Sequence, residues 1–168
     1  RDAFSSWPEA MENTEAIASY DPFCHPLIFP DYPTDDPASE LRKRVLSGAE
    51  IRYGELNDAI LSRIDYELAI IEEKGFSAYF LVMHDIVQMS SRTCGRGSGA
   101  ASIVSYSLFI TAVDPLAHHL YFERFLSPAR TDPPDIDVDF AWDERDAVFA
   151  AVYADLGVDH CARVANHL

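Results

Sequence analysis

Three aspartates that alternate with apolar residues are the most chemically distinctive feature of this sequence. Asp135, Asp137 and Asp139 lie in the segment DIDVDF, directly after two prolines. Strict alternation predicts a β-strand, in which every second side chain points to the same face, about 6.6 Å apart. Three carboxylates on one face repel one another, so the pattern favours divalent cations that neutralise them. Mg²⁺ takes oxygen ligands from one or two carboxylates and substrate phosphates, and two such ions could activate an attacking oxygen.

A solvated edge strand, whose charges block aggregation, explains such a segment about as well as a metal site does. A calcium-binding EF-hand loop also opens with D-x-D-x-D. That loop requires glycine at its sixth position, where this chain has Phe140, and Ile136 and Val138 between the aspartates belong in a strand. The residues alone therefore leave two interpretations open, a metal-binding strand and a solvated edge.

A glycine-rich segment provides a second candidate site, this time for an anion. Gly95, Gly97 and Gly99 alternate with Arg96 and Ser98, and small residues follow. We expect a tight turn that leads into a helix, where backbone N–H groups and the helix dipole favour an anion. The segment matches neither the P-loop nor G-x-G-x-x-G. Close packing between helices explains such a turn more often than phosphate binding does.

An arginine between aromatic residues forms a third constellation, in the segment FERFL. Arg124 could pair with Glu123 or a neighbour, or it could clamp a phosphate with its planar guanidinium. From the residues alone we favour the structural role. Arg130 follows six positions later. The adjacent His118 and His119 diverge on any helix, which indicates a surface position.

The elements that would position these residues are mostly helical. We expect one helix from a capping box at Ser6 to Ala18, and another from a cap at Ser39 to Val45. The spacing of apolar residues predicts a helix over 54–74 that stops at Gly75, with Glu67 off its apolar stripe. A buried helix over 78–90, capped by Ser77, comes next.

The remaining segments are shorter or less regular. An extended connection covers 20–38, a short amphipathic segment covers 119–127, and strands are expected over 135–140 and from 160 to 166. The final helix begins at Trp142 or Asp143 and stops at Gly157. Its inward residues are expected to be Val148, Phe149, Val152 and Tyr153.

Composition limits the function classes. The 168 residues are 48% apolar and 24% charged, as expected for a globular domain with its own core. The sequence contains no apolar run long enough for a membrane span and no pattern of a signal peptide. A net charge of −15 repels nucleic acid, so a nucleic-acid function would need a bound cation or basic surface elsewhere. Three scattered cysteines (Cys24, Cys94, Cys161) fit a reducing, intracellular compartment. Because the chain starts with Arg1, we expect it to be part of a longer protein.

The order GRGSGAAS, YFERFLSPAR, DPPDIDVDF resembles the palm of bacterial C-family DNA polymerases, the α subunit of DNA polymerase III and its error-prone relatives. The segment EKGFSAYFLVMHDIV resembles the residues that precede the glycine turn in that family. The resemblance implies an α+β fold: a nucleotidyltransferase core of the polymerase-beta type, with a small mixed sheet flanked by helices. Residues 1–38 would form an N-terminal helix and extended arm, and 39–168 a partial palm.

The resemblance also implies the site. Gly97 and Ser98 would hold the incoming triphosphate, and Asp135 and Asp137 would bind the catalytic Mg²⁺ ions. The supporting residues would be Asp139 at the metals and Arg124, Arg96 and Arg130 near the phosphates. The implied partners are primer–template DNA, a deoxynucleoside triphosphate and, in the full-length protein, replisome subunits such as the sliding clamp, in the bacterial cytoplasm and without a membrane.

Some features depart from the family pattern. The third catalytic aspartate of the family would lie beyond Leu168, so we expect this chain alone to be inactive. The segment from Val87 to Gly95 is shorter than usual, and Phe109 stands where glycine is usual. Two alternatives stay open: a noncatalytic domain that binds a cation and protein partners, and another nucleotidyltransferase with the same core.

Overall fold

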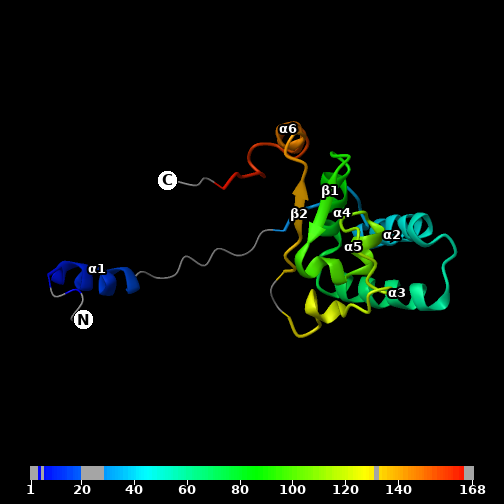
Figure 1. Cartoon of the computed structure of the whole chain (residues 1–168), viewed down its shortest axis with the longest axis horizontal. Helices are drawn as coiled ribbons and strands as arrows, with labels where there is room; N and C mark the ends of the chain where they lie inside the picture. Colours follow the sequence, from blue (N-terminus) through cyan, green and yellow to red (C-terminus); the bar gives the residue numbers. More distant parts are fainter. Residues whose placement is uncertain (1–3, 5, 20–28, 131–132, 165–168) are drawn as a thin grey trace.

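Four helices share one apolar core. The computed structural model describes residues 4, 6–19, 29–130 and 133–164. Helix α2 lies against α4 and α5, and α3 lies against α5 (Figure 1). The bounds of these helices are α2 (Pro37–Tyr53), α3 (Asp58–Glu73), α4 (Ser77–Val87) and α5 (Ile103–Ser107). Their apolar faces supply most of the fully buried side chains, including Leu41, Ile64, Phe80, Leu81 and Ile103.

Helix α2 starts earlier and ends later than its sequence pattern predicts. The carboxylate of Asp36 accepts a hydrogen bond from the backbone N–H of Ser39 at 3.0 Å, so Asp36 is the N-cap and the expected cap at Ser39 is wrong. Pro37 occupies the first helical position, where its missing N–H costs nothing. At Gly48 a methyl group would overlap the carbonyl oxygen of Ser107, so glycine is what lets α2 and α5 approach closely.

Helices α3 and α4 confirm the periodicity of their sequences. Ile60, Ile64 and Ile71 are buried along α3, which begins after an Asn57 cap. Gly75 ends α3 in the left-handed conformation, with φ of 73°. The segment after it is a helix, as expected, but it already starts at Ser77, with no side-chain cap.

A two-stranded antiparallel sheet stands beside the helices, with β1 (Thr93–Arg96) next to β2 (Asp137–Phe140) (Figure 1). Strand β2 was expected, although it begins two residues later than predicted. Strand β1 was not expected, because the sequence there predicted only a turn. The two strands make the α+β class correct, but the part of the chain described here holds only this antiparallel pair and not a mixed sheet.

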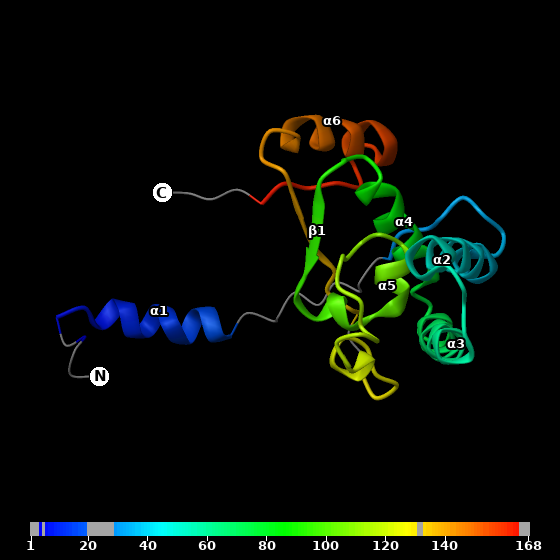
Figure 2. The ribbon, with the colours of Figure 1, turned by 45° about the vertical axis from the view of Figure 1, so that its right-hand side comes forward.

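The C-terminal segment follows β2. Figure 2 shows α6 (Arg145–Leu156) across one end of the strand pair. Gly157 ends it with φ of 84°, as expected. The expected inward face is largely wrong: Val148 is buried, but Phe149 is 36% exposed and the other two side chains are only partly covered. Residues 160–164 form no strand, and the rest of that predicted strand lies outside the described residues.

The N-terminal segment holds α1 (Pro8–Ala18), which confirms the expected helix. Its N-cap is Trp7, which makes no side-chain cap, so the predicted capping box at Ser6 is wrong. No residue of α1 is buried. Residues 29–36 form neither helix nor strand, as expected for an extended connection, and 20–28 lie outside the described residues. Within the described ranges, no helix has the length and apolar character needed to span a bilayer.

Candidate functional site

The glycine turn and the acidic strand, which are far apart in the sequence, lie side by side in the structure. Arg96 is opposite Asp137 in the strand pair, and Gly97 follows directly as the first residue of the 3₁₀ helix η2 (Gly97–Ala101). Gly97 has φ of 70°, and a β-carbon there would lie 3.4 Å from Oδ2 of Asp137. Glycine thus provides both the left-handed turn and room beside the carboxylate.

Arg96 neutralises part of the acidic strand. Its Nε donates to Oδ1 of Asp139 at 3.2 Å, and its Nη1 lies 3.7 Å from Oδ2 of Asp137. The hydrogen bond to Asp139 and the charge of Asp137 raise the pKa of the guanidinium. All three side chains are at least 40% exposed, so these ion pairs are weak and open to competition from another cation or anion.

Asp135 lies just before β2, so only Asp137 and Asp139 belong to the strand itself. The prediction of three carboxylates on one face of a strand is therefore wrong in part. The charges of Asp135 and Asp137 both act on the hydroxyl of Tyr79 on α4. Burial raises the pKa of this hydroxyl, and the two carboxylates raise it further. A hydrogen bond with the backbone of Ile136 lowers it. Asp135 and Asp137 thus lie near the same hydroxyl.

The carboxylates fit a hard cation. Among the described residues no three His, Cys, Asp or Glu side chains converge on one point. Two carboxylates are nevertheless what Mg²⁺ commonly takes from a protein when substrate phosphates and water supply its other ligands. The guanidinium of Arg96 stands beside Asp137 and Asp139, so a cation bound there would compete with it for these carboxylates.

The helix start behind the glycine turn is not free to bind an anion. Helix α5 has only five residues, and its first N–H groups, from Ile103 and Val104, donate to the carboxylate of Glu67 at 3.1 and 3.2 Å. The expected contribution of the helix N-terminus is therefore wrong. Any anion at this turn must use the exposed backbone of Gly97, the hydroxyl of Ser98 and the side chain of Arg96.

Arg124 lies in the 3₁₀ helix η3 (Phe122–Arg124), next to two buried aromatic rings. Phe122 and Phe125 are fully buried and pack edge to face, while Arg124 is exposed. Glu123 does not pair with it; its carboxylate accepts a hydrogen bond from the hydroxyl of Tyr66 at 2.7 Å, which lowers the pKa of Glu123. The core thus anchors η3 and leaves Arg124 at the surface.

Arg130 has a structural contact. Its Nη1 donates to the carbonyl oxygen of Phe125 at 2.9 Å. The ammonium of Lys74 donates to the carbonyl oxygens of Pro128 and Arg130, at 2.5 and 2.9 Å. These bonds hold the segment after η3 against the end of α3. His118 and His119 are exposed, as expected.

Glu67 is the residue that the sequence interpretation misplaced most. It is fully buried, although it was expected outside the apolar stripe of its helix. Besides the two N–H groups of α5, it accepts hydrogen bonds from the hydroxyl of Ser102 at 2.7 Å and from Nε of Arg63 at 2.6 Å. Burial raises the pKa of Glu67, and these donors oppose the shift. The i,i+4 spacing of Arg63 and Glu67 was the available signal for the pair.

A second carboxylate that the sequence did not single out joins the two strands. Glu144 accepts hydrogen bonds from the hydroxyls of Ser90 (2.5 Å) and Ser91 (2.8 Å) and from Nε of Arg92 (3.1 Å). These donors, with Ser90 first, lower the pKa of Glu144 to about 2. Arg92 also donates to Asp143 at 2.6 Å. The network ties the segment before β1 to the segment after β2.

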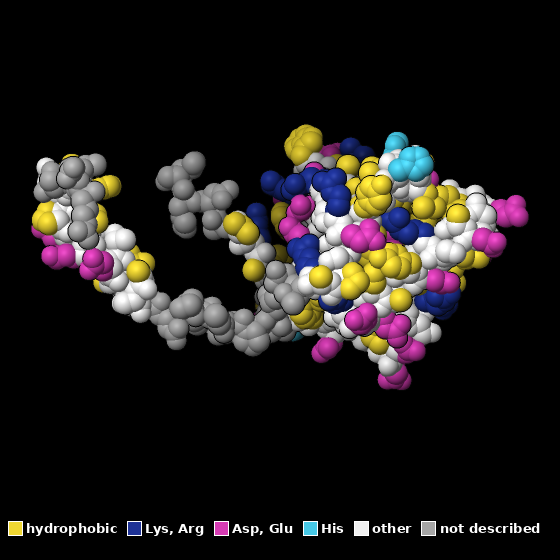
Figure 3. Space-filling model, turned by 90° about the horizontal axis from the view of Figure 1, so that it is seen from below, with side chains coloured by type: hydrophobic (Ala, Val, Ile, Leu, Met, Phe, Trp, Pro, Cys, Tyr) yellow, Lys and Arg dark blue, Asp and Glu magenta, His cyan; other side chains and the backbone are white. Residues whose placement is uncertain are grey.

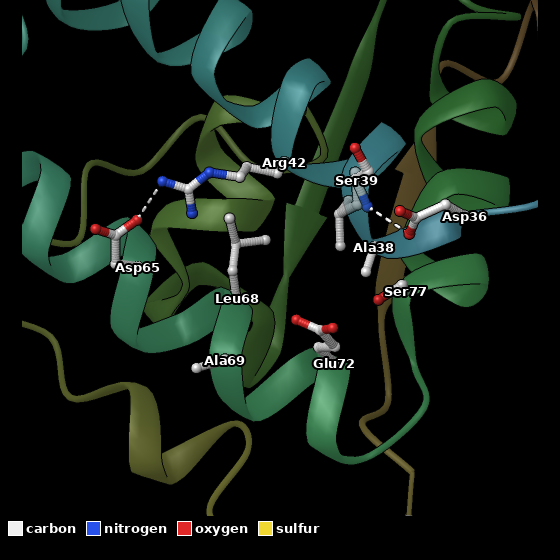
Figure 4. Close-up of a pocket in the computed structure, with 10 residues that line it drawn as sticks. Asp36, Ala38, Ser39, Arg42, Asp65, Leu68, Ala69, Glu72 and Ser77 are labelled. Atoms are coloured by element: carbon white, nitrogen blue, oxygen red, sulfur yellow. Dashed lines mark hydrogen bonds and ion pairs between the residues drawn. The ribbon is translucent and has the colours of Figure 1, made fainter.

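The cavity in Figure 4 lies between α2 and α3, away from the carboxylates of the acidic strand. Its volume is about 340 Å³, and it contains an exposed ion pair between Arg42 and Asp65 at 2.7 Å. None of the residues that line it belongs to the glycine turn or the acidic strand: Asp36, Ala38, Ser39, Leu41, Arg42, Asp65, Leu68, Ala69, Glu72 and Ser77. We therefore place the candidate site at the exposed junction of β1, η2 and β2 and not in this cavity.

On the face in Figure 3, Lys and Arg side chains lie mainly over the upper left and centre of the body, and a group of Asp and Glu side chains lies along its lower edge. With a net charge of −15, such a surface gives no extended attraction for a polyanion. Local groups at the glycine turn must supply any anion binding.

Comparison with known proteins identifies the family. The family model for the bacterial DNA polymerase III alpha NTPase domain matches residues 39–167. An error-prone DNA polymerase of Symbiobacterium thermophilum is 42% identical over 98% of this chain and 16% of its own length. One from Mycobacterium bovis is 48% identical over 84% of this chain and 13% of its own length.

The DNA polymerase III subunit alpha of Borreliella burgdorferi is also similar, at 39% identity over 96% of this chain and 15% of its own length. The chain thus spans about one sixth of the length of the relatives it matches. The family match covers the glycine turn, η3 and the acidic strand together. This chain belongs to the bacterial DNA polymerase III alpha family.

Proposed function

We propose that this chain forms the part of a bacterial DNA polymerase that binds the incoming deoxynucleoside triphosphate and the divalent cations for nucleotidyl transfer. The observation that carries the proposal is the closeness of Gly97 to Asp137: a β-carbon at Gly97 would lie 3.4 Å from Oδ2 of Asp137, so the glycine turn lies beside a carboxylate. A phosphate held by the turn would lie next to a cation held by the carboxylate. That juxtaposition is what phosphoryl transfer requires, because the chemistry depends on positioning and charge neutralisation.

On this proposal, each residue of the junction has its own role. The backbone N–H groups at Gly97 and Ser98, and the Ser98 hydroxyl, bind oxygens of the triphosphate. Arg96 exchanges its carboxylate partners for a phosphate, which its exposure allows. Arg124 reaches the triphosphate from the anchored η3 segment, and Arg130 supports it by holding the segment that follows.

Asp135 and Asp137 are the proposed ligands of Mg²⁺, with Asp139 in a supporting role. When bound, the ions would lower the pKa of the primer 3′-hydroxyl and stabilise charge on the leaving pyrophosphate. The protein groups orient the carboxylates: the strand pairing fixes Asp137 opposite Arg96, and Ile136 and Val138 pack against the core. We propose that residues 39–168 form part of a polymerase-beta-type palm and that residues 1–38 form an arm.

The full-length enzyme would copy primer–template DNA during replication or repair synthesis in the bacterial cytoplasm, with subunits such as the sliding clamp as partners. By analogy with the family, a further metal-binding aspartate would lie outside residues 1–168. We therefore expect this chain to bind nucleotide and cation without turnover. DNA binding would depend mainly on basic surface in other parts of the enzyme, because this chain carries a net charge of −15.

A calorimetric titration tests the proposal. A deoxynucleoside triphosphate with Mg²⁺ is added to the wild-type chain and to the double variant Asp135→Asn/Asp137→Asn. We expect metal-dependent binding in the wild type that the double variant loses. The matched control is Asp146→Asn/Asp155→Asn, which removes the same charge from exposed positions on α6. Equal binding by all three proteins would contradict the assignment of the acidic strand as the metal site.

A further inference from the structure

We propose that the Arg63–Glu67 pair of α3 positions the glycine turn, and that it is the element on which the geometry of the phosphate site depends. The pair lies behind the turn, on the core side. Glu67 is fully buried and its carboxylate accepts four hydrogen bonds, three of them from consecutive residues that follow η2. Few carboxylates are this buried, and each oxygen of this one has two donors.

The carboxylate fixes the end of the turn. Its donors are the Ser102 hydroxyl and the N–H groups of Ile103 and Val104. Ser102 in turn accepts a hydrogen bond from the N–H of Ser105 at 3.1 Å and donates its own N–H to Gly99 at 3.2 Å. A five-residue helix has little stability of its own, so α5 and the turn before it depend on this external acceptor.

The guanidinium of Arg63 connects the glycine turn to the segment before η3, which carries Arg124. Nη2 of Arg63 donates to the carbonyl oxygen of Ala101, the last residue of η2, at 2.9 Å. The same nitrogen donates to the carbonyl oxygen of Leu120 at 3.1 Å, just before η3. One side chain on α3 therefore sets the distance between the glycine turn and the segment that carries Arg124.

The stability of the fold does not by itself explain why a buried ion pair occupies this position. Desolvating two charges is expensive, and replacing a buried ion pair by apolar residues is often neutral or stabilising. A planar guanidinium that reaches two separate carbonyls and a carboxylate provides geometric precision that apolar packing lacks. What the turn binds rests on the function proposed above, but the positioning itself requires no nucleotide.

Hydrogen exchange of the backbone amides over 97–104 tests the positioning directly. Arg63→Lys keeps the charge but loses the planar fork, and we expect exchange in this segment to rise about three- to tenfold. Arg42→Lys is the matched control, because Arg42 makes an exposed ion pair with Asp65 beside the same helix (Figure 4). Val45→Ala removes buried core volume in α2 and controls for general destabilisation.

The positioning is supported if Arg63→Lys accelerates exchange in the turn selectively and neither control does. It is overturned if exchange in the turn stays unchanged, or if it rises by the same factor as in α2 and α4. Glu67→Gln should accelerate exchange in the turn selectively and by a larger factor. Its amide NH₂ group would face hydrogen-bond donors where a carboxylate oxygen accepts from them. If this variant does not fold, Arg63→Lys still decides.

Binding of Mg²⁺ and a deoxynucleoside triphosphate provides the second measurement. If the wild type binds, Arg63→Lys should weaken the affinity about three- to tenfold, while Arg42→Lys and Val45→Ala leave it unchanged. Unchanged affinity in Arg63→Lys would overturn the link to the phosphate site. If the wild type does not bind, the proposed function fails, and the exchange measurement still decides whether the pair positions the turn.

Discussion

Phe109 holds a backbone conformation that normally belongs to glycine, and this leads to an unusual prediction. Its φ is 62°, in the left-handed region where a β-carbon meets the following carbonyl oxygen. We predict that Phe109→Gly is more stable than Phe109→Ala. Both variants lose the aromatic ring, which faces the Arg52 guanidinium at 4.4 Å, so both should be less stable than the wild type. Only the alanine variant keeps the β-carbon that causes the strain.

The expected difference follows from two opposing free energies. The left-handed conformation costs a residue with a β-carbon about 1–2 kcal/mol. Glycine loses more backbone entropy on folding, which opposes its advantage by about 0.4–1 kcal/mol. The net advantage of Phe109→Gly over Phe109→Ala is therefore about 0.5–1 kcal/mol, or about 1–4 °C in Tm for a chain of this size.

Urea unfolding followed by circular dichroism measures this difference in the free energy of unfolding. Glu50, at an exposed position of α2, provides the control, because its backbone is helical. There the order should reverse, with Glu50→Ala more stable than Glu50→Gly by about 1 kcal/mol. If Phe109→Ala proved as stable as Phe109→Gly while the control behaved normally, the reasoning from backbone strain would be refuted.

Three further predictions concern Glu144, Arg96 and Gly48. The pKa of Glu144 is about 2 in the folded chain, against an ordinary 4.5. Its contacts therefore stabilise the fold fully above pH 4.5, and this stabilisation is lost as the pH falls toward 2. In Glu144→Gln, the urea concentration at the unfolding midpoint should depend less on pH in this range. Removing the competing guanidinium with Arg96→Gln should strengthen Mn²⁺ binding without nucleotide up to about fivefold, measured by electron paramagnetic resonance, and weaken triphosphate binding. Gly48→Ala forces a methyl group onto the carbonyl of Ser107 and should cost at least about 3 kcal/mol of unfolding free energy, whereas Ser47→Ala should cost little.

Local patterns in the sequence predicted the elements whose cause is local. The apolar spacing of α3 and the glycine stops at Gly75 and Gly157 were sufficient for the helices they bound. The start of α2 was missed although its signal was present, because the Asp36–Pro37 pair is a stronger start than Ser39. The departure at Phe109 was visible in the sequence through the family resemblance, and the positive φ explains why glycine is usual there.

The parts that the sequence could not supply depend on partners distant in the chain. Strand β1 contains Gly95 and no alternating pattern, and it is a strand only because β2 pairs with it. Glu67 has a charged side chain next to apolar neighbours, and its burial depends on donors from Ser102 and α5. The inward face of α6 was predicted from its pattern alone, but few described residues pack against it, so Phe149 remains partly exposed.

The pairing of β1 with β2 has a consequence for the order of folding. The two strands close a loop of about 40 residues, whereas α2, α3 and α4 follow one another through short connections. Contacts between neighbours in sequence form early, and those that close long loops form late. The contacts of α2 with α3 should therefore form first. The packing of α2 against α5, where Gly48 meets Ser107, spans more of the chain than the strand pair does, so both belong to the later steps. A newly made chain would therefore complete its core and its proposed site in the same late steps, and unfolding would open the two together.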